Sequence, residues 1–117
     1  MSINLLAQDD SWIPAACTLP TVEQPLRRAE FDALFSEDVI SVARDSELQV
    51  TLALRPEPEV GARAASLAVA ETGCCSFFTF GFTITDGRID MVISAESPHH
   101  DVIAALATRA TSLAGAA

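Results

Sequence analysis

Two alternating apolar runs joined by Asp86-Gly87 restrict the fold of this 117-residue chain more than any other feature. Asp-Gly is a strong signal for a two-residue hairpin loop, because the residues of such loops must accept positive φ angles. The alternation predicts strands over residues 77–85 and 89–94, each with one buried face. The apolar positions of these strands are Phe78, Phe80, Phe82, Ile84, Ile89, Met91 and Ile93.

The short loop also predicts how the two strands pair. The expected partners are Ile84 with Ile89, Phe82 with Met91, and Phe80 with Ile93. Each apolar residue then meets another apolar residue, as a sheet with one covered face requires.

The rest of the chain predicts a second hairpin and three helices. Strands are expected over residues 39–44 and 48–55, with the turn at 45–47, and helices over 24–36, over 58–72 and from Ser97-Pro98 onward. The order α-ββ-α-ββ-α predicts an α+β domain with a four-stranded antiparallel sheet and helices on one face. Residues 1–20 are expected to form an N-terminal arm, and 21–117 a single domain.

The opposite face of the predicted sheet is polar. It is expected to be solvated or paired with a second copy of the chain, which makes a homodimer one candidate assembly. Its predicted residues are Thr51, Thr79, Thr83, Thr85 and Asp90.

Charge and composition argue against several classes of partner. The chain has 16 acidic and seven basic residues and a net charge of −9, whereas nucleic acids and anionic membranes need clustered Lys and Arg. No apolar run approaches the roughly 20 residues that span a bilayer. The first ten residues carry no basic cluster, so a secretory signal peptide is not expected. The odd cysteine count then predicts free thiols in the cytoplasm.

The adjacent pair Cys74-Cys75 is the most unusual chemical feature, at the predicted joint between a helix and a strand. Continuing the hairpin register places Cys75 near Pro98 and Cys74 near His99. His99 and His100 are therefore expected at the same end of the sheet as the two thiols. They also stand at the start of the last predicted helix, whose positive dipole end favours nearby thiolates.

Cys17 is a third candidate ligand, in the irregular segment before Thr18-Leu19-Pro20. Cysteine thiolates with supporting imidazoles suit soft or borderline ions such as Hg(II), Cu(I) or Zn(II), and three thiolates suit As(III). The main hypothesis is a metal or metalloid site formed by Cys17, Cys74 and Cys75, with His99 and His100 in support. Adjacent cysteines do not fit the spacing of a zinc finger.

Two other interpretations are open. The first is a thiol-dependent enzyme or redox protein, with Cys75 acting beside His99 or His100, or with a transient Cys74–Cys75 bridge. The second is a dimerising interaction domain whose cysteines only fill the core. The chain has no Gly-rich phosphate loop, no G-x-S-x-G motif and no H-E-x-x-H motif, so the sequence favours binding over catalysis.

Two segments resemble a group of small bacterial proteins, some of them associated with heavy-metal-responsive regulators and mercury resistance. They are Cys17-Thr18-Leu19-Pro20 and Glu71-x-x-Cys74-Cys75-x-Phe77-Phe78-x-Phe80, and the similarity extends from about Pro14 to the last predicted helix. The resemblance implies a role with a metal or metalloid.

Overall fold

The computed structural model describes residues 24–74 and 78–114, and there it has the predicted order α-ββ-α-ββ-α. The predicted arm at residues 1–20 lies outside these ranges. The elements are α2 (Gln24–Asp38), β1 (Val39–Ser46), β2 (Gln49–Leu54), α3 (Pro58–Cys74), β3 (Phe78–Thr85), β4 (Arg88–Ala95) and α4 (His100–Leu113). No helix within the described ranges is both long enough and apolar enough to cross a bilayer.

The four strands form one antiparallel sheet in the order β1-β2-β4-β3, so each hairpin contributes one central and one edge strand. The β3–β4 register confirms the three predicted pairs, and it continues to the pair Phe78–Ala95 at the far end of the hairpin. The connecting loop is also as predicted, since Asp86 and Gly87 both have positive φ, at 51° and 69°. Two positive φ angles match the twist of a hairpin strand pair.

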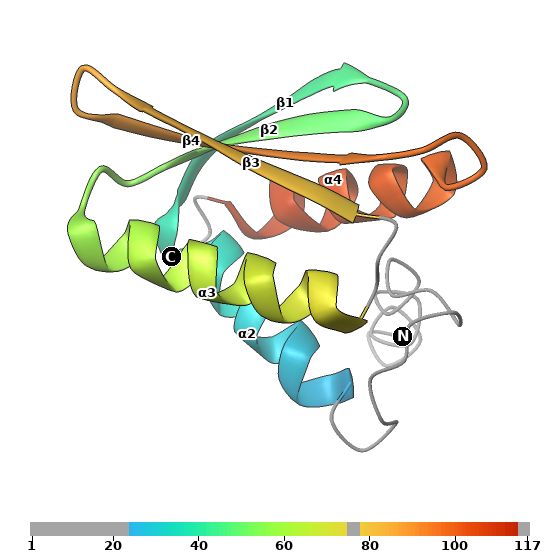
Figure 1. Cartoon of the computed structure of the whole chain (residues 1–117), viewed down its shortest axis with the longest axis horizontal. Coiled ribbons are helices and arrows are strands. Elements are labelled where there is room, and N and C mark those ends of the chain that lie inside the picture. Colours follow the sequence, from blue (N-terminus) through green and yellow to red (C-terminus); the bar gives the residue numbers. More distant parts are fainter. Residues whose placement is uncertain (1–23, 75–77, 115–117) are drawn as a thin grey trace.

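In the described part of the chain, the three helices lie on one side of the sheet, and no helix or strand covers its other side (Figure 1). This arrangement follows from the sequence, because the apolar positions of each strand all face the same way. The core lies between the two layers. Its side chains with no more than 2% exposure are Phe31, Leu34, Phe35, Val50, Leu52, Leu54, Ala64, Met91, Ile93, Ile103, Leu106 and Ala110.

Three sequence predictions need correction. The last helix begins at His100 with His99 as its N-cap, because Ser97 and Pro98 belong to a preceding turn closed by the bond from His99 N–H to the Glu96 carbonyl. Gly73 does not end α3, which continues to Cys74. Ile84 pairs as predicted but is 70% exposed, because the helical layer does not extend over the end of β3.

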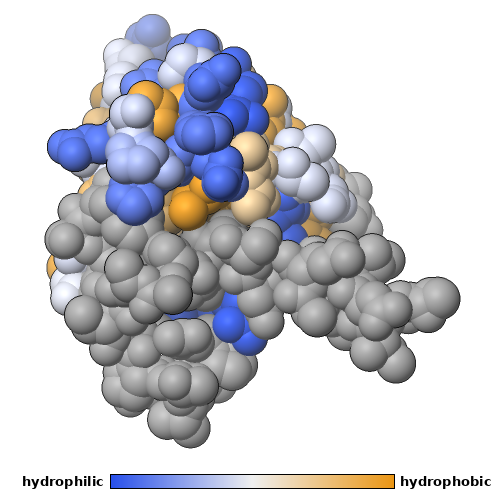
Figure 2. Space-filling model, turned by 90° about the vertical axis from the view of Figure 1, so that its right-hand side faces the viewer, coloured by the Kyte–Doolittle hydropathy of each residue, from blue (hydrophilic) through white to orange (hydrophobic). Residues whose placement is uncertain are grey.

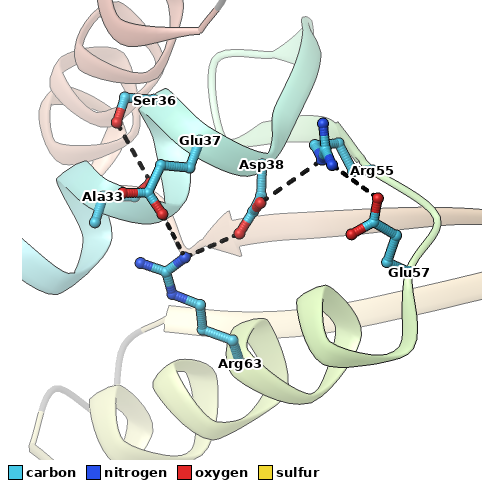
Figure 3. A network of polar contacts seen from close by, with 7 residues as sticks. All are labelled: Ala33, Ser36, Glu37, Asp38, Arg55, Glu57 and Arg63. Atoms are coloured by element: carbon cyan, nitrogen blue, oxygen red, sulfur yellow. Dashed lines mark hydrogen bonds and ion pairs between the residues drawn. The ribbon is translucent and has the colours of Figure 1, made fainter. Parts of the chain in front are cut away.

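A polar network holds the end of α2 against its neighbours (Figure 3). Arg63 of α3 contacts Glu37 at 3.1 Å and Asp38 at 3.0 Å, while Arg55, just after β2, reaches Asp38 at 3.9 Å and Glu57 at 2.7 Å. The Arg55 N–H also donates to the Asp38 carbonyl at 2.8 Å. Asp38 is buried, so its charge is compensated by two arginines from different elements.

Candidate functional site

The candidate thiol site lies where α3 ends and β3 begins. Cys74 is the last residue of α3, and only its backbone is described. Cys17 and Cys75 fall outside the described residues, so the predicted meeting of the three thiols stays a prediction. The elements around them are described, and they determine which side chains surround this end of the molecule.

The histidines stand at the same end of the sheet as Cys74. Phe78 begins β3 and pairs with Ala95, the last residue of β4, and α4 starts five residues after Ala95. In Figure 1 the end of α3, the start of β3, the end of β4 and the start of α4 are all on the right-hand side. The first turn of α4 therefore lies at the same end of the sheet as the start of β3, the strand that comes after Cys74 in the chain.

The first turn of α4 presents polar groups to solvent. His99 is half-buried and its carbonyl accepts the first helical hydrogen bonds, from the N–H groups of Val102 and Ile103. His100 is exposed, and its Nε2 lies 3.0 Å from Asp101 Oδ1. Figure 2 shows this side of the molecule, where the described surface is mainly hydrophilic with small apolar patches. Solvent access to His100 leaves it available as a ligand.

Glu71 is the most unusual described group near the site. It lies one helical turn before Cys74, yet its side chain is only 1% exposed. Arg27, in the first turns of α2, donates from Nη1 to Glu71 Oε1 at 3.0 Å and also lies 3.5 Å from Glu30. The second carboxylate oxygen, Oε2, has no hydrogen-bond partner in the part of the chain that the structure describes.

Burial decides the electrostatics of Glu71. Removal from water raises the pKa of this carboxyl above its ordinary value of 4.5, and the hydrogen bond and positive charge of Arg27 only partly oppose the rise. A buried carboxylate with a hydrogen bond to only one of its oxygens destabilises the folded state unless a further donor or cation approaches it. The Glu71 carboxyl therefore holds its proton more readily than a carboxyl in water does. The partial negative charge at the carboxyl end of a helix acts in the same direction.

Sequence reasoning assigned no role to Glu71 or Arg27. The signal for Glu71 was its spacing, because Val60, Ala64, Leu67 and Glu71 follow one another at helical intervals along the buried face of α3. Nothing in the sequence identified Arg27 as its partner, since the two residues are 44 positions apart on different helices.

Within the described ranges, no group of three or more Cys, His, Asp or Glu side chains is arranged to hold a metal ion. The histidine–aspartate contact at the start of α4 alone does not make a complete site. Comparison of the chain with protein-family models, curated proteins and solved structures gives no match.

Proposed function

We propose that this chain is a small cytoplasmic thiol protein that binds one soft metal or metalloid ion through Cys17, Cys74 and Cys75. His99 and His100 are supporting ligands or hydrogen-bond donors. The proposal rests on the chemistry of the three cysteines and on the described elements that flank them.

The observation that carries the proposal is the Arg27–Glu71 contact. It fixes the first turns of α2 to the last turn of α3, which ends at Cys74. Cys17 precedes α2 by seven residues, a stretch that reaches at most about 25 Å when extended. The contact therefore supports the proposal, because it holds the start of α2, to which the Cys17 segment is joined, against the helix that ends at Cys74.

The partial negative charge at the end of α3 favours thiols that bind a cation over thiols without one. The raised pKa of Glu71 marks a region poor in water, and the helix end adds partial negative charge. Three thiolates there would repel one another, and a bound soft cation would relieve that repulsion. Thiolate donors also explain why Hg(II), Cu(I), As(III) or Zn(II) fit better than the hard ions that prefer oxygen ligands.

The test is a titration of the reduced full-length chain with Hg(II) and with As(III). We expect one ion to bind per chain. Native mass spectrometry measures this stoichiometry, and for mercury the ultraviolet thiolate-to-metal absorption also reports binding. The affinity for Hg(II) should rise with pH, because each thiol must lose its proton when it binds this ion.

Single serine substitutions identify the ligands. Cys17→Ser, Cys74→Ser and Cys75→Ser should each weaken binding by more than about 100-fold, beyond the effect typical of groups that only support a ligand. His99→Ala and His100→Ala serve as controls with smaller effects. If all three serine variants bind like the parent, the thiols are structural and the proposal is wrong. A Cys74–Cys75 bridge forming without any ion binding would instead favour the redox interpretation.

A further inference from the structure

The two edges of the described sheet differ in how they are protected. Edge strand β1 carries Arg44 and Asp45 and has two register irregularities where it pairs with β2. Charges and bulges of this kind discourage another chain from pairing with an edge. Edge strand β3 has none of them: its eight residues, Phe-Thr-Phe-Gly-Phe-Thr-Ile-Thr, contain no charge and no proline, and its pairing with β4 is regular. Such an edge is a template for strand addition.

A mostly apolar groove beside β3, between this strand and α3, consists of two hollows, the first of which is also lined by Glu57 and Arg88. One hollow of about 360 Å³ includes Gly61, Ala62 and Ile84 in its lining, and a second of about 300 Å³ lies between Val69 and Phe80. Both Ile84 and Val69 are prominently exposed, at 70% and 72%. The small side chains of α3 leave the aromatic side of β3 only half covered.

The exposed face of α3 beside this groove is free of charge. Its exposed residues beyond the first turn are Ala62, Ser66, Val69, Ala70, Thr72 and Gly73. The helix has three charged residues: Arg63 turns toward Glu37 and Asp38 (Figure 3), Glu71 is buried against Arg27, and Glu59 is exposed in the first turn. In a chain of net charge −9, the part of this surface beyond the first turn of α3, which carries no exposed charge, is where two copies can approach with least repulsion.

We propose that β3 and the exposed face of α3 form a two-fold interface with a second copy of this chain. The sequence of β3 is self-complementary. Its positions 78, 80, 82 and 84 are all Phe or Ile, and positions 79, 81, 83 and 85 are all Thr or Gly. Any antiparallel pairing of β3 with itself that keeps the two faces matched therefore sets apolar against apolar and small polar against small polar.

The geometry extends the sheet without disturbing its layers. A two-fold axis perpendicular to the sheet pairs β3 with β3 of the second copy and keeps both helical layers on one side. The two α3 helices then become neighbours across the axis. Their small residues allow close approach, and the exposed Val69 and Ile84 are buried.

The size of this surface is adequate for association. The interface would be as long as the eight-residue strand, about 26 Å. Its height would be the combined thickness of the strand layer and the helix layer, roughly 20 Å. Each copy would therefore bury about 500 Å². The total of about 1,000 Å² is at the lower limit for a specific interface. We therefore expect a reversible dimer with a dissociation constant in the micromolar range. The inference does not depend on the thiols, and its failure would leave the proposed function standing.

Sedimentation velocity and light scattering of the reduced, metal-free full chain test the inference. The parent protein should reach twice the 12.4 kDa mass of one chain as its concentration rises. Ile84→Lys places a charge in the interface and should raise the dissociation constant at least about 30-fold, the effect of losing one binding hot spot. Val69→Lys, on α3, should act in the same direction.

Ile40→Lys is the matched control, because Ile40 is a 60% exposed isoleucine on the opposite edge strand. It should leave the dissociation constant unchanged, and circular dichroism should show that all three variants are folded. A parent chain that stays monomeric at high micromolar concentration overturns the inference. So does a dimer that Ile40→Lys weakens as much as Ile84→Lys does, since the interface would then lie elsewhere.

Discussion

At the scale of single residues, Glu37 and Asp38 show how burial changes the worth of one ion pair. Both carboxylates contact the same arginine at nearly equal distances, 3.1 Å and 3.0 Å from Arg63 Nη1. The Glu37 side chain is 60% exposed, however, while that of Asp38 is 11% exposed. Water therefore screens the first pair far more than the second.

This contrast predicts unequal costs for neighbouring neutral substitutions. Asp38→Asn should lower the free energy of unfolding by about 2 kcal/mol, because it weakens charge-assisted contacts to two arginines in a buried place. Glu37→Gln should cost less than about 1 kcal/mol. Urea unfolding of both variants measures the difference. Equal costs would mean that the two carboxylates share one environment in solution.

Glu71 gives a pH-dependent prediction at the same scale. Because its pKa is raised in the folded state, the folded protein holds this proton more tightly than the unfolded chain does. Its contribution to stability is therefore full below the unfolded value of about 4.5 and is lost as pH rises through the folded pKa. The parent should lose stability relative to Glu71→Gln as pH increases from 4.5. Urea unfolding of the two proteins at a series of pH values checks this, and a gap that widens in the parent's favour would refute it.

Single residues were predictable from the sequence where a local rule governs them. The loop at Asp86-Gly87 and the pairing of Phe80 with Ile93 follow from turn chemistry and a period of two. The Arg27–Glu71 contact follows from no local rule, because it depends on how two helices pack. The positions of Cys17 and Cys75 are still predictions.

At the scale of elements, β3 changes from core to surface along its length. Phe78 is 3% exposed, Phe80 and Phe82 are half-buried, and Ile84 is 70% exposed. The sequence predicts the alternation of this strand but not the gradient, because periodicity reports which face is apolar and not how far the helical layer extends. The same limit explains the late start of α4, since the turn at Ser97-Pro98 resembles a helix cap in sequence.

The gradient predicts different costs for truncating the two ends of β3. Phe78→Ala should lower the free energy of unfolding by about 3–5 kcal/mol, as expected for emptying a buried aromatic site. Ile84→Ala should cost less than about 1 kcal/mol in dilute protein, where no second copy covers it. Thermal or urea unfolding at low concentration makes the comparison. Similar losses for both would show that the exposed end of β3 is covered in the isolated chain.

At the scale of the whole molecule, the described sheet has a polar open face, an edge strand β1 with charges and irregular pairing, and an edge strand β3 with neither. The open face is lined mainly by polar and small side chains, which need no cover, with Val92 of β4 as an apolar exception. The apolar side of β3 and the neutral face of α3 are different, because they leave apolar surface in water at one corner of an otherwise acidic chain. The proposed two-fold assembly therefore depends on this difference between the edge strands β1 and β3.

Hydrogen exchange can detect this asymmetry directly. The central strands β2 and β4 bond to neighbours on both sides, so their amides should exchange slowest at every protein concentration. If both edges were solvated, the outward-facing amides of β1 and β3 would exchange at similar rates. With β3 paired across a two-fold axis, its outward amides become bonded as the dimer forms, and their protection should increase with protein concentration. Those of β1 should stay constant. Concentration-dependent protection in β1 instead, or in neither edge, would contradict the proposed interface and leave β3 an open edge in solution.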